Sequence, residues 1–423
     1  MEIALFRFFK YISILFFLSS CANFEQELAK DILITHNTPL NRCEVEGFSY
    51  SGIEAGLTKP EILKVLMVHG VGTHFPGYSR RIQENIAAAT GLNVLSRLPK
   101  NIYLRDPANP QKSIGNLRIT YWQNADASKK MLFYELTWSE ITMPDKQLIA
   151  FDTTEQYSKF RVPFNNSMKV FLDNVLPDPL AFESPQGEQI LTAGTQSLCW
   201  LLTTDWKTIP DNRAQVCSLS QSEEIQQFDK QNMLFITHSL GSQILMDTIV
   251  RTADNVAATI TSPDPDLRSA VRRLQNKELT VFMLANQLPI LQIGHPLPRV
   301  HNQIGSYCTP NGKKYRQRVF KAVNIVAFSD PNDLLSYAIP QSFADKYIDS
   351  RLCPLVTNVS VNVAPEISAF GVGIVNPIAA HTDYDKSPKV IELINRGTVD
   401  FEHDSPLDRQ CRFILLKKDR SMK

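Results

Sequence analysis

The serine at position 239 lies where a continuous apolar run gives way to a helical pattern. In "MLFITHSLGSQILM", residues 237–241 form that transition. A serine at a sharp strand-to-helix turn presents its hydroxyl at the carboxyl edge of a sheet, and small neighbours let the two elements pass closely. The start of the following helix supplies free backbone N–H groups and a partial positive charge that can stabilise an oxyanion. Ser239 is therefore a candidate nucleophile.

Two downstream regions contain the residues that would complete a catalytic triad. A serine hydroxyl is a poor nucleophile without a base, and the base needs an acid that orients it. Asp330 and Asp333 follow an apolar run in "NIVAFSDPNDLLSYAIP", and His381 lies in "VNPIAAHTDYDKSPKVIEL", a loop that enters a helical pattern. Loops on a rigid scaffold commonly carry catalytic residues. We expect His381 to be the base and one of the two aspartates to be the acid.

The stretch around Ser239 resembles the nucleophile elbow of the α/β-hydrolase superfamily of serine esterases and lipases. It departs from the G-x-S-x-G pattern at Thr237, where the family has glycine. The resemblance implies the chain order Ser, Asp, His, which His381 satisfies; the one later histidine lies in polar "FEHDSP", without a loop-to-helix context. "DPNDLLSYAIP" resembles a lipase pattern with an Asn-Asp pair. This pattern favours Asp333 as the acid and leaves Asp330 to shape the turn.

An oxyanion hole requires two backbone N–H groups. The resemblance implies that Leu240, directly after the nucleophile, supplies one of them. In "KVLMVHGVGTH", His69 and Gly70 resemble the family's HG motif after an early strand. We expect the second N–H from Val71, with Gly70 as the alternative, and we expect His69 to order this loop.

No metal or cofactor is expected. Four histidines would be available as ligands: His69, His74, His295 and His301. They are accompanied by no HExxH or carboxylate-bearing motif, and no cysteine lies in a CxxC. His74 and His238 flank the candidate site and are expected to pack around it.

Strand and helix patterns alternate along the chain. The predicted strands lie in "KVLMV", "LRITYWQ", "MLFYELTW", "ELTVFMLANQLPIL", "VFKAVNIVAFSD" and "LVTNVSVNV". Helical spacing in "YSRRIQENIAAATGL" and "SPKVIELINRG" predicts helices that stop at Gly91 and Gly397. The alternation predicts an α/β fold with a mostly parallel sheet, and the resemblance implies the α/β-hydrolase fold.

The segment of about 143–229 is too long for a plain connection between strands. It contains two apolar helical faces, over 160–175 and 190–202, and prolines interrupt it. We expect an inserted helical cap, with the alternative that these helices simply cover the sheet. Residues 58–415 are expected to form the hydrolase domain, and 21–57 a tether with an opening strand or two.

Residues 1–20 have the layout of a signal peptide: a short cationic head, an apolar run and small polar residues. Leu18 to Cys21, "LSSC", resembles the bacterial lipobox, which implies a cleaved and diacylated Cys21. Ala22 follows in place of an aspartate, which favours the outer membrane over the inner one. A plain N-terminal membrane helix is the alternative, because the apolar run is near the lower length for spanning.

Composition excludes some classes of protein. The chain has 423 residues with 43% hydrophobic content, enough for a large core, and a formal net charge of +1. It lacks a basic run, so nucleic acid is not an expected partner. Six cysteines lie beyond Cys21, an even number that permits disulfides in an exported protein. Cys199, in apolar "LCWLL", is also compatible with a buried thiol.

These expectations define a lipid-anchored serine hydrolase of the bacterial cell envelope that cleaves carboxylic esters. The anchor and an apolar insertion able to act as a lid suggest lipid acyl esters as substrates. An amidase or thioesterase would use the same triad. From another class, a non-catalytic envelope lipoprotein would retain the fold without the chemistry, and Thr237 is the one hint of such decay.

Overall fold

The computed structural model describes residues 42–96, 98–369, 372–399 and 410–417. These residues belong to two units. One unit, the main body, comprises Arg42–Ala364 and the chain from Asn376 onward. The other contains Pro365–Val375, whose strands β12 (Glu366–Ala369) and β13 (Val372–Val375) pair as an antiparallel hairpin.

The main body is organised around a twelve-stranded sheet. Its strands are β1 (Cys43–Phe48), β2 (Leu63–Val68), β3 (Asn93–Val94), β4 (Lys100–Asp106), β5 (Asn109–Gln123), β6 (Lys130–Thr137), β7 (Arg213–Gln215), β8 (Asn232–His238), β9 (Glu278–Leu284), β10 (Ala322–Ser329), β11 (Pro354–Val361) and β14 (Arg412–Lys417). The order is β14-β1-β11-β10-β9-β8-β2-β6-β5-β4-β7, with β3 paired to β5. The central run from β11 to β6 is parallel, and β1, β4 and β5 add antiparallel pairs.

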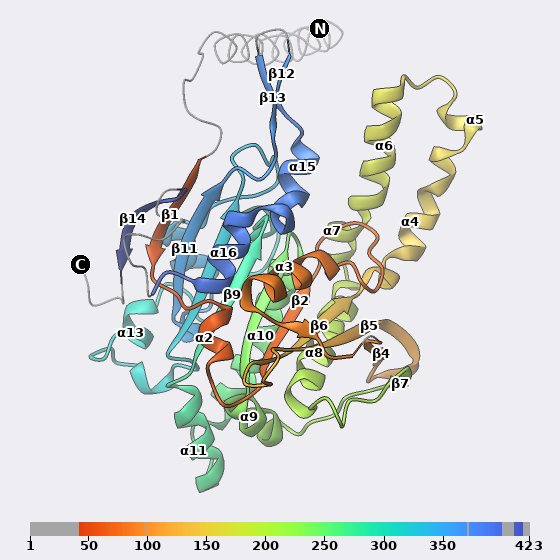
Figure 1. The fold of residues 1–423 in the computed structure, drawn as a ribbon. Coiled ribbons are helices and arrows are strands. Elements are labelled where there is room, and N and C mark those ends of the chain that lie inside the picture. The colour runs from red at the N-terminus through yellow and green to blue at the C-terminus, as the bar shows by residue number, and fades with distance from the viewer. Residues whose placement is uncertain (1–41, 97, 370–371, 400–409, 418–423) are drawn as a thin grey trace, which may run out of the picture. The chain divides into compact units, whose positions relative to one another are not determined.

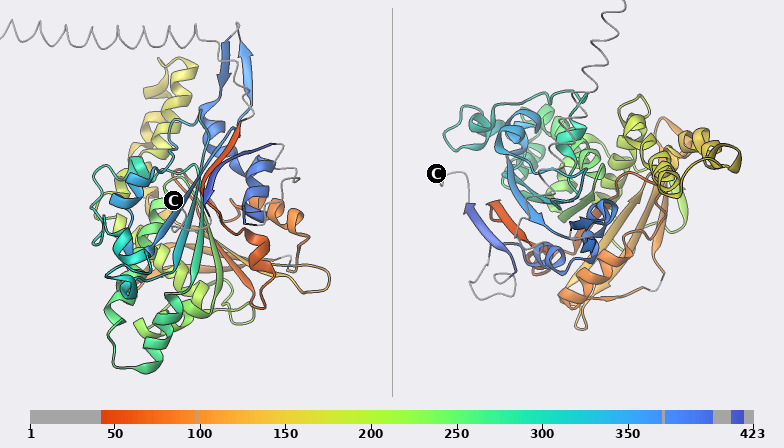
Figure 2. Two further views of the ribbon diagram at one scale, coloured as in Figure 1. Left: turned by 90° about the vertical axis from the view of Figure 1, so that its left-hand side faces the viewer. Right: turned by 90° about the horizontal axis from the view of Figure 1, so that it is seen from above.

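Helices cover both faces of the sheet (Figures 1 and 2). They are α2 (Ile53–Leu57), α3 (Arg80–Thr90), α4 (Met143–Ile149), α5 (Glu155–Ser158), α6 (Pro163–Val175), α7 (Pro177–Phe182), α8 (Gly187–Thr203), α9 (Gln221–Lys230), α10 (Gly241–Thr259), α11 (Pro265–Leu274), α12 (Leu288–Leu291), α13 (Ile304–Cys308), α14 (Gln341–Tyr347), α15 (Pro377–Thr382) and α16 (Pro388–Arg396). Short 3-10 turns are η1 (Ser139–Ile141), η2 (Ala150–Thr153), η3 (Tyr315–Gln317), η4 (Ser350–Leu352) and η5 (Asp383–Lys386).

Strand β2 shows why the sheet needs two covering layers. Every residue of β2 is buried, and its side chains alternate between two separate cores. Leu66 and Val68 join the core under α8, α9, α10 and α11. Val65 and Met67 join the core under α2, α3 and α16. A continuous apolar run is the pattern expected of a parallel strand buried on both faces, and the expected α/β fold with a mostly parallel sheet is confirmed.

The main body begins earlier than residue 58. Strand β1 pairs with β11 and β14, and α2 packs into the same core as α3. Residues 42–57 are therefore part of the sheet and its covering layer, and the boundary expected at 57 is wrong. The sequence alone did not assign the opening strand to the sheet, because its β11 partners lie more than 300 residues away.

The expected cap region divides into two parts of different character. Helices α4 to α7 form a projecting arm, defined here as residues 143–182 and drawn in yellow in Figure 1. Pro163 and Pro177 stand at the starts of α6 and α7, where proline interrupts one helix and begins the next. Helices α8 and α9 instead bury their apolar faces against the sheet. The projecting part thus ends near Phe182, and for residues 187–230 the sheet-covering alternative is correct.

All six cysteines of the main body are paired. The disulfides are Cys43–Cys411, Cys199–Cys217 and Cys308–Cys353. Cys199 is therefore not a free buried thiol. Three disulfides are typical of a protein that folds in an oxidising compartment.

The Cys199–Cys217 disulfide closes a sequence separation of 18 residues between α8 and the segment before α9. We expect the Cys199→Ala/Cys217→Ala variant to lose about 3 kcal/mol of unfolding free energy, because the open loop restores entropy to the unfolded chain. Urea unfolding of variant and wild type without reductant measures this loss. Free thiols at these two positions in denatured, unreduced wild-type protein would contradict the pairing.

Candidate active site

The candidate nucleophile lies at a point where the sheet order reverses. On one side of β2 lie β6, β5 and β4 in that order, and on the other side lie β8, β9, β10 and β11. In open α/β sheets, ligands bind outside the carboxyl ends of the strands at such a switch point. Ser239 follows β8, and the His69-Gly70 loop follows the neighbouring β2. The topology therefore brings the two motifs together.

Ser239 occupies a backbone conformation that side chains rarely adopt, with φ +55°. It lies between the end of β8 at His238 and the start of α10 at Gly241, and its N–H donates to the Leu284 carbonyl at 2.9 Å. A Cβ on Gly241 would lie 2.3 Å from the Val68 carbonyl oxygen, so glycine is required where α10 passes β2. This is the strained strand-to-helix turn that the sequence predicted.

Thr237 fits the turn in place of the family's glycine. Its side chain is fully buried, and its hydroxyl forms a 3.0 Å hydrogen bond with that of Ser242 in the first turn of α10. It also donates to the Phe282 carbonyl on β9 at 3.5 Å. The extra atoms therefore have both space and hydrogen-bond partners beside the helix.

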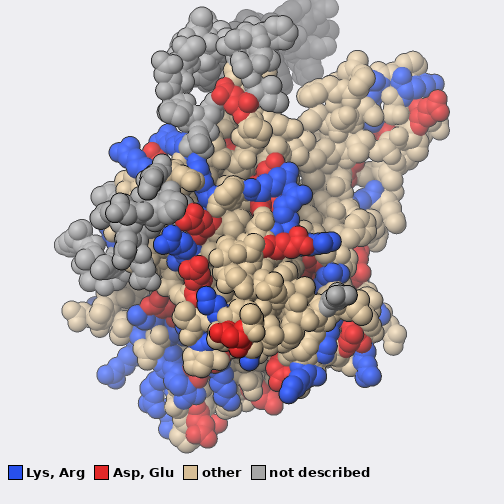
Figure 3. All heavy atoms as spheres, viewed as in Figure 1, with Lys and Arg blue, Asp and Glu red and all other residues tan. Residues whose placement is uncertain are grey.

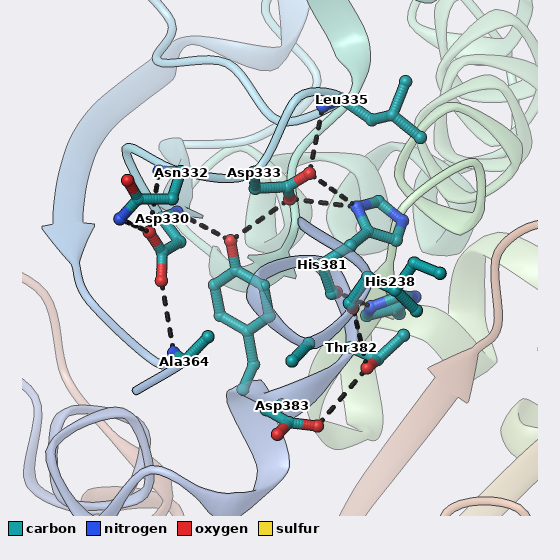
Figure 4. A network of polar contacts seen from close by, with 12 residues as sticks. His238, Asp330, Asn332, Asp333, Leu335, Ala364, His381, Thr382 and Asp383 are labelled. Atoms are coloured by element: carbon teal, nitrogen blue, oxygen red, sulfur yellow. Dashed lines mark hydrogen bonds and ion pairs between the residues drawn. The ribbon is translucent and has the colours of Figure 1, made fainter. Parts of the chain in front are cut away.

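The structure brings His381 and Asp333 into direct contact (Figure 4). The Nδ1 atom of His381 lies 3.0 and 2.9 Å from the two carboxylate oxygens of Asp333. His381 is on α15, whose start is capped by the side chain of Asn376. Asp333 follows β10 and also accepts the Leu335 N–H at 2.9 Å. Because a carboxylate accepts, Nδ1 carries a proton, and Nε2 is the ring nitrogen that is not bonded to Asp333.

The hydroxyl oxygen of Ser239 and Nε2 of His381 are buried and unpaired. Neither the Ser239 hydroxyl nor Nε2 of His381 has a hydrogen-bond partner among the described residues. Buried polar atoms are nearly always satisfied, so each exception calls for an explanation, of which a catalytic role is one. The candidate acid and base are thus in contact, whereas no hydrogen bond joins the Ser239 hydroxyl to the imidazole of His381.

Asp330 has a separate task from Asp333. Its carboxylate accepts the backbone N–H groups of Asn332 at 2.8 Å and Val363 at 2.7 Å. Its own N–H donates to the Tyr384 hydroxyl at 2.7 Å. These bonds hold the turn after β10, so Asp330 shapes the loop and Asp333 is the residue that contacts the imidazole.

Asp333 and His238 are two ionisable groups that contact His381. Burial alone would raise the pKa of Asp333, but the hydrogen bond and charge of His381 outweigh it and hold the pKa below its usual value. Asp333 is therefore a carboxylate at neutral pH. Burial lowers the pKa of His238 to about 3, so this neighbour stays neutral. It donates Nε2–H to the His381 carbonyl at 2.8 Å and anchors the backbone of the base.

The two N–H groups expected to form the oxyanion hole are free. Neither the Leu240 N–H nor the Val71 N–H donates to any residue in the described part of the chain. Gly70 lies in close contact with the turn that contains Ser239. A Cβ there would lie 2.4 Å from the Cβ of Ser239 and 2.9 Å from its hydroxyl oxygen.

His69 orders this loop through a fixed tautomer. Its Nδ1–H donates to the Gly70 carbonyl at 2.7 Å, and its Nε2 accepts the Trp138 N–H at 3.1 Å. Burial lowers its pKa well below the usual value, so the ring is neutral. In a trans peptide the C=O and N–H point in opposite directions. Holding the Gly70 carbonyl therefore fixes the direction of the Val71 N–H.

The remaining histidines do not assemble a metal site. Among the described residues, no cluster of His, Cys, Asp or Glu has the arrangement of a metal centre. His74 donates Nε2–H to the Val71 carbonyl at 3.1 Å. His295 instead lies between Glu183 at 3.4 Å and Asp247 at 3.3 Å.

Sequence reasoning missed two residues that contact this site. The Tyr384 hydroxyl lies 3.5 Å from Asp333, and its place three residues after His381 was a usable signal. Asp178, on α7, accepts the Gly72 N–H at 2.5 Å. Its sequence context, between two prolines, carried no such signal.

Comparison of the chain with protein-family models, curated proteins and solved structures found no match. Within the residues that the structure describes, no helix combines the length and apolar character needed to cross a membrane. Cys21 and the preceding "LSS" lie outside the described residues.

The contact between Gly70 and Ser239 gives a stability prediction. We expect Gly70→Ala to lose about 1–3 kcal/mol of unfolding free energy, because the added methyl overlaps the Ser239 side chain. Gly305→Ala is the matched control, since a Cβ at that position meets open space. Urea unfolding measures both variants, and equal stability of the two would contradict the close approach.

Proposed function

We propose that this protein is a serine hydrolase of the α/β-hydrolase type that cleaves carboxylic esters. The observation that carries the proposal is the strained Ser239 turn together with an Asp333–His381 pair whose Nε2 is buried and unpaired. The elbow at the switch point and the HG loop on the neighbouring strand support the same fold assignment.

The geometry suggests a two-stage reaction. Nε2 of His381 removes the Ser239 proton as the serine oxygen bonds to the ester carbonyl carbon. The Leu240 and Val71 N–H groups stabilise the resulting oxyanion, and Asp333 stabilises the imidazolium. The carbon–oxygen bond to the alcohol then breaks, and His381 donates its proton to the leaving alkoxide. Water, activated by the same imidazole, hydrolyses the acyl-serine and restores the enzyme.

Active-site labelling tests the nucleophile. We expect a fluorophosphonate probe to label the chain lacking residues 1–21 and to leave its Ser239→Ala variant unlabelled, because only an activated serine attacks phosphorus readily. Mass analysis of the labelled peptide, with nitrophenyl acetate turnover, provides the measurement. Labelling that survives the substitution would contradict the proposal.

A matched pair of variants tests the acid. Asp333→Asn should lower kcat by roughly 10³–10⁴-fold, because an amide no longer holds the imidazole in the productive tautomer. Asp330→Asn should act mainly on stability, since its carboxylate holds backbone N–H groups of the turn. Equal losses of kcat in the two folded variants would contradict the separate roles.

Two alternative functions are compatible with this fold: a different hydrolytic reaction, and a role without catalysis. An amidase or thioesterase would use the same triad, and rates on matched ester, amide and thioester substrates separate these activities. A non-catalytic envelope lipoprotein with a hydrolase-like fold is the other alternative. The accommodated Thr237 and the intact Asp333–His381 pair argue against decay of the site.

Lipid acyl esters are the substrates that the surface favours. The arm, residues 143–182, carries large apolar side chains with high exposure, including Phe160 at 90% and Phe164 at 74%. Figure 3 shows the arm largely uncharged except at its far end. Within the arm, Arg161 and Asp152 form an ion pair at 2.5 Å. An exposed apolar surface of this kind marks a site for a lipid or protein contact.

The proposed location is the bacterial cell envelope, with the protein held to a membrane by an acylated Cys21. The lipobox-like "LSSC" and the three disulfides support it. Ala22 favours the outer membrane. A tether of this kind would keep the main body near lipid substrates.

The arm gives a test of the substrate class. Phe160→Ser/Phe164→Ser should hydrolyse an ester embedded in phosphatidylcholine vesicles at least about tenfold more slowly, because each lost phenyl forfeits about 1.5–3 kcal/mol of burial. Hydrolysis of soluble nitrophenyl acetate should change by less than about twofold, since truncating exposed side chains leaves the triad intact. Leu98→Ser, 79% exposed but outside the arm, is the control. Equal vesicle rates in all three proteins would contradict a lipid role for the arm.

A further inference from the structure

Asp178 of the arm is a fully buried carboxylate with three donors. Its Oδ2 accepts the Gly72 N–H at 2.5 Å and faces Nζ of Lys146 at 3.0 Å. Its Oδ1 accepts the Thr142 hydroxyl at 2.5 Å. The Gly72 N–H and the Lys146 ammonium can only donate, which favours the ionised carboxylate, although burial raises the pKa of Asp178 above its usual value. Lys146 is itself buried and balances the charge.

The Gly72 bond fixes one of the two peptides that flank Val71. The Val71–Gly72 peptide is held at both ends, by Asp178 at its N–H and by His74 at its C=O. The Gly70–Val71 peptide is held by His69 at the Gly70 carbonyl. Since peptides are planar, these three bonds together determine the orientation of the Val71 backbone.

We propose that Asp178 is a positioning residue that holds the Val71 N–H in the orientation needed to stabilise the oxyanion. The proposal rests on the proposed hydrolase function and goes beyond the triad. It gives residues at the point where the arm joins the main body a role in positioning the oxyanion hole. Lys146 also matters here, because an uncompensated carboxylate so close to the loop would repel a developing oxyanion.

A purely structural role for the Asp178–Lys146 pair is the competing explanation. Removing one partner of a buried ion pair leaves an uncompensated charge and destabilises the fold, whatever its effect on the loop. If Asp178 positions the loop, activity depends on the acceptor that it offers to the Gly72 N–H. If the pair is purely structural, stability depends on the two opposite charges. Variants that remove both charges but differ in the acceptor separate them.

The experiment compares two double variants of the full chain in detergent. Asp178→Leu/Lys146→Met offers Gly72 no acceptor, whereas Asp178→Asn/Lys146→Met retains an amide oxygen that can accept the N–H. With nitrophenyl acetate we expect kcat of the leucine form to be at least about tenfold lower than that of the asparagine form. KM should agree within about twofold, because the oxyanion contact strengthens in the transition state.

Control measurements make the outcome decisive. Asp152→Asn, on the same arm but paired with Arg161, should keep wild-type kcat. Thermal unfolding checks that both double variants fold, and Asp178→Ala/Lys146→Met replaces the leucine form if that form does not fold. Equal kcat in the acceptor-free and asparagine forms would overturn the proposal. Absence of Ser239-dependent turnover in the wild type would instead overturn the proposed function itself.

Discussion

The close contact between Gly70 and Ser239 is the constraint on which the candidate site depends. It joins the loop after β2 to the turn after β8, two neighbouring parallel strands whose carboxyl ends meet at the switch point. A side chain at position 70 would occupy the space of the serine, and one at 241 would collide with β2. The serine's strained backbone persists because the surrounding sheet and α10 determine it.

Burial distinguishes the histidines of the candidate site, because it lowers the pKa values of His69 and His238. His69 and His238 are held neutral, because a charged ring would lose its hydration in these positions. Each ring donates an N–H to a backbone carbonyl and so holds a nearby loop of the candidate site in place. His381 alone among these three has a carboxylate partner, Asp333, able to stabilise a positive ring. The arrangement separates the candidate base from two structural imidazoles.

Much of the site was predictable because its motifs are local. The strand, turn and helix around Ser239, and the helix that ends at Gly91, follow from apolar runs and from glycine at element ends. Asp333 was preferred over Asp330 from a short pattern, and the structure brings Asp333 to His381. The N-terminal boundary at 57 failed, since β1 gains its place from β11 and β14, which are remote in sequence. The cap was only partly foreseen, because an apolar helical face fits a projecting arm as well as a sheet-covering layer.

The sequence by itself determined the alternation of strands and helices, and the nucleophile, acid and base candidates in their order. These features depend on residue type and short-range spacing, which local sterics and burial decide. Only the tertiary structure decided the cysteine pairing, the tautomers of His69 and His238, and the contact between Asp178 and Gly72. The cysteine pairing, the His238 tautomer and the Asp178–Gly72 contact join residues that no local sequence pattern connects, and the His69 tautomer depends on the distant Trp138 N–H as well as on the adjacent Gly70. These contacts form because packing obliges buried polar groups to find partners.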